Sequence, residues 1–312
     1  MPTTDRVFRA MGSDCHVLVE SASLADELGD LAQERVALLE QCWSRFRPDS
    51  ELNRLNAKAG RGPVAVSPDL LVLVQRMAEA WTLSNGLFDP TILGSLTALG
   101  YDADLSIVSA RATMAPASAL APAPGLSGAV VDAGASTVSL PAGVGIDPGA
   151  IGKGLAADLV LADLMSAGAT GAMVNLGGDL AFAGVPDAGA WSIGVEDARK
   201  PIDEPHRILQ VLEYPGDHST TGIATSTTLK RRWAQGRRHH VIDPRTGTMS
   251  ASDLVQVTVV AEAAWVAEVT ATTALLMRAD EANAWLRQID VPAILITADT
   301  VISTMHEEDA HV

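Results

Sequence analysis

A glycine-rich turn that leads into a helix is the strongest constraint on the fold of this chain. It reads Gly145-Ile-Asp-Pro-Gly-Ala-Ile-Gly-Lys-Gly154, and a helix over 151–167 and a strand over 171–176 are predicted to follow it. The turn is not a Walker A loop, because Gly154 stands where a hydroxyl residue would hold magnesium. Backbone N–H groups, Asp147 and Lys153 could instead surround a polyphosphate or its metal. The alternative for Lys153 is a solvated lysine on a helix face.

Composition sets the outer limits. With 312 residues, 47% of them hydrophobic, the chain can bury a core large enough for one big domain or two packed halves. The net charge of −16 argues against nucleic acid or an anionic membrane as the main partner, since both require clustered Lys and Arg. The basic stretch Lys230-Arg-Arg-Trp233 does not change this expectation, because the surrounding chain is acidic.

The cysteines and the first residues indicate an intracellular protein. Cys15 and Cys42 are the only cysteines and lack metal-type spacing, so both are expected to be reduced. The start of the sequence lacks an apolar signal region, and no uninterrupted apolar run of about 18 residues occurs. We expect a cytoplasmic protein with no stable membrane insertion.

Hydrophobic spacing predicts strands and helices that are interspersed without a regular βαβ repeat. A strand over 6–20 precedes a long helix over 23–46, and Ser50 and Ser67 are the expected starts of the next helices. Residues 102–128, rich in Ala, Pro and Ser, are expected to form a loop or insertion, and 298–312 a flexible tail. The other expected elements are a helix over 67–84, strands at 130–140, 191–196, 207–214, 255–260 and 291–297, and a helix over 262–278.

The segment His240-Val-Ile-Asp-Pro-Arg-Thr-Gly247 combines a tight turn with titratable side chains. Proline and glycine alone would be explained by a plain hairpin corner. A plain corner does not account for His240 and Asp243, which could present a base and a carboxylate to a hydroxyl or a metal. His239 is expected to be solvated.

A third candidate lies in the helix over 262–278. Glu268 and Thr272 are one helical turn apart, so a carboxylate and a hydroxyl would converge on one face, as a hard cation such as magnesium requires. The alternative is an exposed glutamate and a threonine that bonds to its own helix.

Together these motifs resemble the ApbE family, the FAD:protein FMN transferases. The resemblance runs from about residue 7 to about 297. It rests on the ordered segments Met11-Gly12, Pro48–Asn56, Gly86-Leu-Phe-Asp-Pro-Thr91, Asp147 with Lys153-Gly154, Asn175-Leu-Gly-Gly-Asp179, Ala224-Thr-Ser226 and His240–Gly247.

The resemblance implies an α+β fold of the ApbE type, formed as a single large domain of two packed halves over 1–312. It also implies a magnesium-dependent reaction in which FAD is cleaved, AMP leaves, and FMN passes to a Thr or Ser hydroxyl of an acceptor flavoprotein. His240, with Asp243, would be catalytic, and His240 would take the hydroxyl proton. The backbone oxygen of Ala150 and the side chains of Glu268 and Thr272 would hold Mg²⁺. FAD would contact Met11, Phe46, Leu87, Phe88, Asp89, Asp147, Lys153 and His240.

Three positions depart from the family pattern. Glu268 replaces the usual aspartate, Phe46 a common tyrosine, and Thr227 the usual glycine after Thr-Ser. Two other functions remain open at this stage: hydrolysis of FAD to FMN and AMP, and a carrier that binds FAD without turnover.

Overall fold

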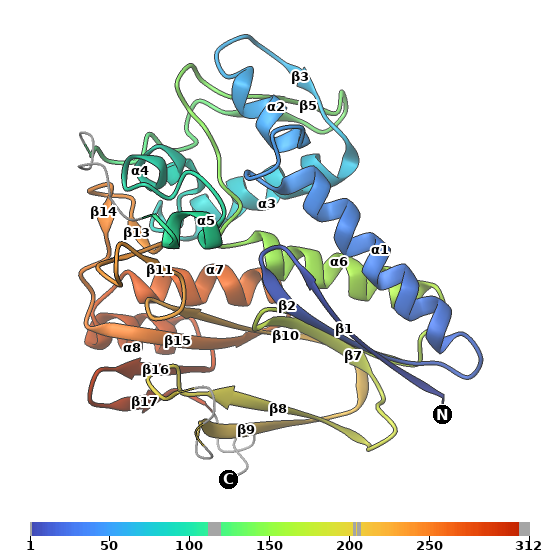
Figure 1. Cartoon of the computed structure of the whole chain (residues 1–312). Helices are drawn as coiled ribbons and strands as arrows, with labels where there is room; N and C mark the ends of the chain where they lie inside the picture. Colours follow the sequence, from blue (N-terminus) through green and yellow to red (C-terminus); the bar gives the residue numbers. More distant parts are fainter. Residues whose placement is uncertain (1, 112–119, 202–203, 205–206, 306–312) are drawn as a thin grey trace. The chain divides into compact units, whose positions relative to one another are not determined.

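Strands from both ends of the chain meet in one eight-stranded sheet (Figure 1). The fold was determined as a computed structural model that describes residues 2–111, 120–201, 204 and 207–305. Every neighbouring pair in the sheet is antiparallel. The strands, in sheet order, are β1 (Thr3–Ala10), β2 (Ser13–Glu20), β6 (Gly171–Leu176), β7 (Asp179–Gly184), β10 (Asp217–Thr227), β15 (Leu254–Ala261), β16 (Ala293–Thr297) and β17 (Val301–Ser303).

The chain divides into two compact units, each discontinuous in sequence. Unit 1 contains the large sheet and consists of Met1–Val36, Lys153–Lys230 and Ser252–Val312. Unit 2 consists of Ala37–Gly152 and Arg231–Ala251.

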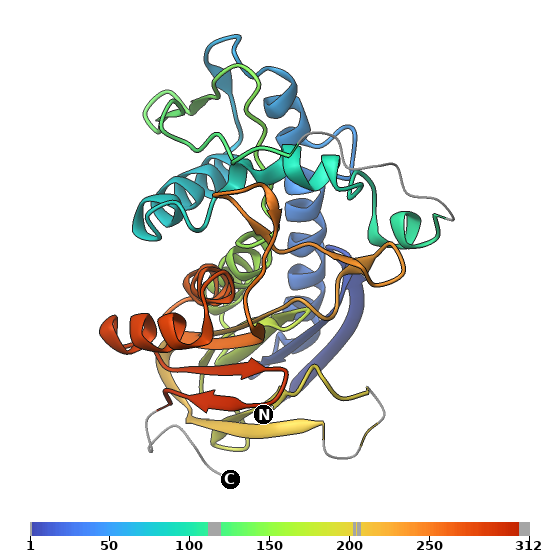
Figure 2. The same cartoon turned by 90° about the vertical axis from the view of Figure 1, so that its left-hand side faces the viewer.

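The two faces of the unit 1 sheet are covered differently (Figures 1 and 2). The hairpin of β8 (Ala190–Glu196) and β9 (Ile208–Pro215) covers one face, where Trp191 and Ile193 pack with Phe182 and Ile223. Helix α7 (Ala264–Leu275) covers the other face, and α8 (Ala279–Gln288) packs beside β16. Because side chains alternate along a strand, Asp179 of β7 and Ser226 of β10 point to the helix face. This alternation decides which polar groups can meet α7.

Unit 2 is built from helices, short hairpins and a small three-stranded sheet. Ser50 and Ser67 accept hydrogen bonds from the amides of Asn53 and Leu70, so each caps its helix as expected. The helices are α2 (Glu51–Ala57), α3 (Pro68–Leu83), the 3₁₀ turn η1 (Pro90–Ile92), α4 (Leu93–Ala98) and α5 (Leu105–Ser109), and α1 (Ala25–Trp43) begins in unit 1 and ends in unit 2. The strands are β3 (Val64–Ala65), β5 (Thr137–Ser139) and β4 (Val130–Asp132), and the pairs β11 (Arg232–Trp233) with β12 (Arg238–His239) and β13 (Ile242–Asp243) with β14 (Thr248–Met249).

Most predicted elements are present, including α1, α3, β6, β8, β9, β15, α7, β16 and α6 (Gly152–Ser166). The single strand predicted over 6–20 is wrong. It is a hairpin whose turn, Met11-Gly12, has positive φ at both residues, 51° and 67°. The strand predicted over 130–140 is likewise two short strands, β4 and β5, and β7 and β10 were not predicted as strands.

Two segments expected to be irregular contain regular structure. α5 lies within 102–128 and β17 within 298–312. Residues 112–119 and 306–312 of these segments lie outside the described residues. In the described part of the chain, no helix combines the length and apolar character needed to span a bilayer.

Candidate functional site

Lys153 lies between two buried carboxylates in unit 1. It is the second residue of α6, and its ammonium group forms ion pairs with Asp179 and, at 3.2 Å, with Glu268 Oε1. The side chains of Asp179 and Glu268 are 2% and 3% exposed, so neither carboxylate is a solvated surface group. The alternatives of an exposed Glu268 and a solvated Lys153 are therefore wrong. We refer to Lys153, Asp179 and Glu268 as the lysine cluster.

Close contact between α6 and α7 assembles the lysine cluster. The amide of Gly154 donates to Glu268 Oε2 at 2.8 Å, so both oxygens of this carboxylate have partners on α6. A Cβ atom at Gly154 would lie 2.5 Å from the carbonyl oxygen of Ala264, which no side chain could tolerate without movement of the backbone. The glycine after Lys153 is therefore required for helix contact.

Asp158 strengthens the same junction one turn further along α6. Its two carboxylate oxygens accept hydrogen bonds from the amides of Ala264 and Trp265, at 2.8 and 2.9 Å. These are orphan donors at the first turn of α7, and an acidic partner also suits the positive end of the helix dipole. The start of α7 is thus fixed against α6.

Two hydroxyl groups extend the oxygen-rich region on the helix face. Thr272 Oγ1 and Ser226 Oγ lie 2.8 Å apart in a hydrogen bond, so Thr272 is directed toward β10, not back to its own helix. Asp179 stands opposite Ala224 in the pairing of β7 with β10, and Ser226 follows on the same face two residues later. Glu268 and Thr272 are one turn apart on α7 and bond to different neighbours, Glu268 to α6 and Thr272 to β10, while Asp179 and Ser226 add further oxygen atoms on the same face of the sheet.

The charges in the lysine cluster do not balance within it. One ammonium group faces two carboxylates, and Asp179 Oδ1 is buried without a hydrogen-bond partner among the described residues. Carboxylate and hydroxyl oxygens are the donors that magnesium prefers, so the donor set fits this ion. Over the described residues, no group of three or more His, Cys, Asp or Glu side chains is arranged to hold a metal. A magnesium ion held by two carboxylates can take its remaining oxygens from hydroxyl groups, backbone carbonyls, water or a bound phosphate.

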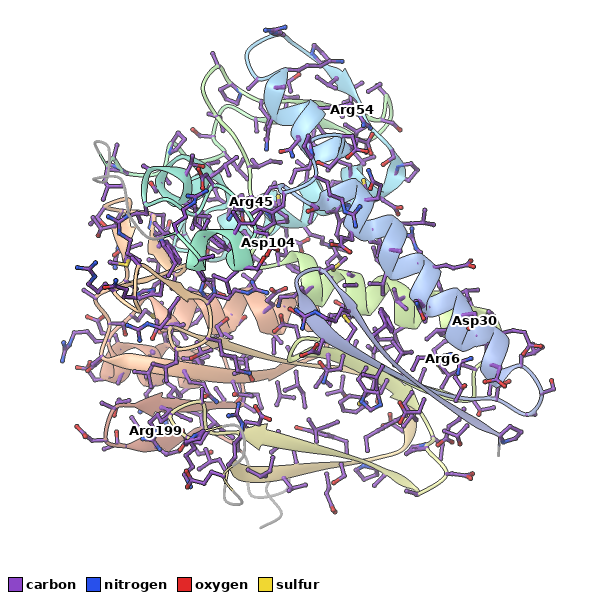
Figure 3. All side chains as sticks on the ribbon, in the orientation of Figure 1. Arg6, Asp30, Arg45, Arg54, Asp104 and Arg199 are labelled. Atoms are coloured by element: carbon purple, nitrogen blue, oxygen red, sulfur yellow. The ribbon has the colours of Figure 1, made fainter. Side chains whose placement is uncertain are left out.

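Asp147 is a buried residue of unit 2, and the partners of its side chain belong to the same unit. Its Oδ1 accepts from the amide of Gly149 at 2.7 Å, and its Oδ2 lies 2.6 Å from Arg45 Nε. Arg45, labelled in Figure 3, lies just beyond α1, and its guanidinium group is 4.0 Å from the ring centre of Phe46 and 4.4 Å from that of Tyr101. A cation held between two aromatic faces and a carboxylate is strongly positioned. Asp147 therefore anchors both the turn before Ala150 and the Arg45–Phe46 pair.

Asn56 explains why the motif Pro48–Asn56 accompanies this turn. Its side-chain amide donates to the carbonyl oxygen of Ile146 and accepts from the amide of the same residue, each at 2.9 Å. The amide of Asp147 donates to Pro90 O at 2.8 Å. Two sequence motifs and the glycine-rich turn are thus joined within unit 2.

The segment Leu87–Asp89 is mostly structural. Phe88 is 3% exposed, and Asp89 caps η1 by accepting from the amide and the hydroxyl of Thr91, at 2.8 and 2.6 Å. The other oxygen of Asp89 accepts from Trp81 Nε1 at 3.2 Å. Among the three residues predicted to contact FAD here, Leu87 is the one with a partly exposed side chain. Met11 is partly exposed and Phe46 is 37% exposed, so both side chains are also accessible.

His240 follows β12, and Asp243 ends β13 on the next hairpin. The carboxylate of Asp243 accepts from Arg245 Nε at 2.9 Å and from Arg245 Nη2 at 2.8 Å. Burial raises the pKa of Asp243, but the hydrogen bonds from Arg245 outweigh it and the pKa is lowered. A Cβ atom at Gly247, where φ is 71°, would lie 2.0 Å from Ala121 O. Asp243 and Gly247 therefore fix the corner that follows His240.

His239 differs from expectation because it is half-buried, not solvated. Its Nδ1 atom is buried and has no hydrogen-bond partner among the described residues. Burial, followed by repulsion from Arg232, lowers the pKa of His239, so its imidazole is neutral at pH 7. Two adjacent imidazoles therefore lie at the end of β12 and directly after it, and the sequence pattern singled out only His240.

The structure brings together Lys153 and Glu268 in unit 1, with Thr272 one turn further along α7 bonded to Ser226, and it joins Asp147 to Phe46 through Arg45 in unit 2. Sequence reasoning missed the roles of Asp179, Ser226 and Arg45. Asp179 ends the motif Asn175-Leu-Gly-Gly-Asp179, and Ser226 ends Ala224-Thr-Ser226, so both carried a signal. Arg45 lies outside any motif.

Comparison with known proteins gives a consistent answer over nearly the whole chain. A sequence model of the ApbE family matches residues 11–295. The FAD:protein FMN transferase of Treponema pallidum is 30% identical over 93% of this chain and 83% of its own length, and that of Vibrio cholerae is 28% identical over 89% and 80%.

Solved structures agree with the fold. An ApbE protein of Thermotoga maritima superposes with a TM-score of 0.83 at 22% identity, covering 97% of each chain. The flavin transferase ApbE of Vibrio cholerae gives a TM-score of 0.79 at 24% identity, covering 98% of each chain. The family match spans every candidate residue from Met11 to Thr272, and the chain therefore belongs to the ApbE family.

Proposed function

We propose that this protein is a magnesium-dependent transferase that cleaves FAD and attaches FMN to a Thr or Ser hydroxyl of an acceptor flavoprotein, with release of AMP. The relatives from Treponema pallidum and Vibrio cholerae are named FAD:protein FMN transferases. The observation that carries the proposal is the lysine cluster, because a buried lysine between two carboxylates at a helix start suits a phosphate ester and its metal.

The reaction joins the acceptor oxygen to the phosphorus of the FMN half of FAD. The P–O bond to the AMP half breaks, and AMP leaves with the bond electrons. The proton of the acceptor hydroxyl must go to a base, and His240 is our candidate. A positioned base of this kind contributes about 10²- to 10⁴-fold to the rate.

Magnesium would neutralise charge on the pyrophosphate of FAD. Glu268 and Thr272 are our proposed side-chain ligands, and the resemblance adds the backbone oxygen of Ala150. Ser226 holds the Thr272 hydroxyl in place, and Lys153 offers a second cation to the phosphates. Asp243 positions the loop of His240 through Arg245.

FAD recognition is assigned to Met11, Phe46, Leu87 and Asp147 together with Lys153. Met11 is in the left-handed region, with φ of 51°, at the tip of the β1–β2 hairpin. Residues other than glycine adopt this conformation uncommonly, and those held in it cluster at active sites and ligand-binding loops. Asp147 acts through Arg45, while Phe88 and Asp89 hold the shape of the loop that carries Leu87. The expected cytoplasmic location remains a prediction.

The test compares two neighbouring histidines. Purified protein is incubated with FAD, Mg²⁺ and an unflavinylated candidate acceptor, and AMP and covalently bound FMN are measured together. His240→Ala should lose at least about a hundredfold in transfer with little change in FAD affinity. His239→Ala, which removes an imidazole from the preceding residue, is the matched control and should retain transfer. Equal losses in both variants, or full transfer in His240→Ala, would contradict the assignment of the base.

Chelation tests the metal. Excess EDTA should stop AMP release, and added Mg²⁺ should restore it. Undiminished AMP release in EDTA would refute the metal requirement. FMN found free in solution without acceptor labelling would identify a hydrolase, and tight FAD binding with no AMP would identify a carrier.

A further inference from the structure

The β11–β12 hairpin concentrates positive charge in an acidic protein. Residues 230–242 contain five Lys and Arg residues and no Asp or Glu, in a chain of net charge −16. Three of them, Arg232, Arg237 and Arg238, lie on the hairpin itself, which we call the arginine hairpin and define as residues 232–239.

The charges of the arginine hairpin are not compensated within the described part of the chain. Arg232 Nε donates to Gly236 O at 2.9 Å, Arg237 Nε to Ala234 O at 3.1 Å, and Arg238 Nη1 to Leu99 O at 2.6 Å. All three acceptors are backbone carbonyls, and none of these arginines forms an ion pair with an acidic residue that the structure describes. Arg232 and Arg237 are exposed. Their charge is therefore available to an outside partner.

The arginine hairpin is also held rigidly. Trp233 is 1% exposed, stacks on Tyr101 with ring centres 5.0 Å apart, and donates to Leu99 O at 3.0 Å. That carbonyl also receives Arg238, so two side chains of the hairpin are fixed at the end of α4. Ala234, Gln235 and Gly236 have positive φ in succession, which forms a tight turn. A preordered surface loses little entropy when it binds.

The hairpin lies next to the proposed base along the chain. His240 directly follows β12, and β13 begins two residues later. A partner held by Arg232 and Arg237 would therefore be bound by the same short element that carries His240. Such a partner has to deliver a Thr or Ser hydroxyl.

We propose that the arginine hairpin docks an acidic segment of the acceptor protein, close in sequence to the Thr or Ser that receives FMN. This inference rests on the proposed function. Exposed guanidinium groups that have no acidic partner among the described residues are suited to bind carboxylates through charge-assisted hydrogen bonds. Nucleic acid is disfavoured as the partner, since its affinity depends on many phosphate contacts along an extended basic surface, whereas this hairpin offers three arginines in a chain of net charge −16.

The experiment measures binding without turnover. The probe is a fluorescein-labelled peptide of about 15 residues that is rich in Glu and contains one Thr. Its anisotropy is followed with the full chain at low and physiological salt. Arg232→Glu combined with Arg237→Glu should weaken binding about tenfold or more, and salt should weaken the binding of the parent protein.

The matched control is Arg54→Glu combined with Arg61→Glu. Both residues are exposed, belong to unit 2 and give the same change in charge, and Arg54 (Figure 3) also donates to a backbone carbonyl, that of Asp49. Because both double variants change the net charge equally, the general charge effect is the same in both. The control should therefore lose much less peptide affinity than the hairpin variant. Equal losses in both double variants, or no binding by the parent, would overturn the proposal.

Two further measurements distinguish peptide docking from nucleic-acid binding and from FAD binding. If an oligo-dT strand binds with the same loss in the hairpin variant and displaces the peptide, the surface is a nucleic-acid site and the proposal fails. FAD affinity, followed by flavin fluorescence, should be the same in parent and hairpin variant. Failure to bind or cleave FAD would refute the proposed function, whereas the peptide result tests the docking surface alone.

Discussion

Replacement of Gly154 by alanine is the most direct test of how the lysine cluster is built. The added Cβ atom would lie 2.5 Å from Ala264 O, whereas ordinary contacts begin at 3.4 Å, so the helices must separate by the difference, 0.9 Å. A movement of this size is also enough to break the 2.8 Å bond from Gly154 N to Glu268, because hydrogen bonds weaken steeply beyond about 3.2 Å.

The expected magnitude follows from three contributions. Overpacking costs about 1–3 kcal/mol, and loss of a hydrogen bond to a charged group about 1.5–3 kcal/mol. Alanine recovers about 1 kcal/mol relative to glycine within a helix. Gly154→Ala should therefore lower the free energy of unfolding by about 1.5–5 kcal/mol.

Gly94 provides the control. It lies in α4, is exposed, and a Cβ atom there would meet nothing within 4 Å, so Gly94→Ala should stabilise the protein by up to about 1 kcal/mol. Calorimetry of both variants, with hydrogen exchange over residues 153–166, measures the effect globally and locally. If Gly154→Ala is as stable as the parent and exchange over 153–166 is unchanged, the helix contact does not limit this position and our reasoning is wrong.

Three other predictions concern single side chains. Glu268→Asp should keep or raise AMP release and Glu268→Gln should lower it with a weaker response to Mg²⁺; a Gln variant equal to the parent would exclude Glu268 as a ligand. Burial raises the pKa of Cys42 to about 12, so at pH 8 only about one thiol in 10⁴ is ionised, and iodoacetamide should label Cys42 in urea but not in the native protein, as mass spectrometry would detect. The hydrogen bond from the Arg199 side chain lowers the pKa of Asp197 below 3.8, so the ionised carboxylate stabilises the folded protein fully above about pH 4 and less as the pH falls through the lowered pKa. Asp197→Asn should therefore reduce Tm at pH 7 and flatten the fall in Tm below pH 4. An unchanged profile of Tm against pH would contradict this.

Local signals in the sequence were sufficient for the helices. Ser50 and Ser67 cap their helices by contacts three residues ahead, so the pattern and its physical cause lie within the same window. Strand β7 had no such signal. All six of its residues are buried, so it lacks the alternation that marks a half-exposed strand. The β1–β2 turn was missed for another reason: it has Met11 at a position where asparagine would have indicated a hairpin.

The sequence predicted those parts of the candidate site whose residues are neighbours along the chain. Lys153 and its glycines could be recognised, because they form one turn. Its carboxylate partner Glu268 is 115 residues away, and a helical spacing alone could not distinguish a buried ligand from a surface residue. Burial and partner choice arise when β7, β10 and α7 meet, and this depends on the tertiary fold.

The sheet order has a consequence for synthesis of the chain. β2 pairs with β6, and Thr170, just before β6, bonds to Glu20 across 150 residues of sequence. At about 5–20 residues per second, a ribosome needs about 8–30 s to make that stretch. During this time the β1–β2 hairpin leaves the ribosome with an open edge, while most of unit 2 is completed before the sheet can grow. Slower translation should therefore lengthen the time during which this open edge can bind chaperones or aggregate.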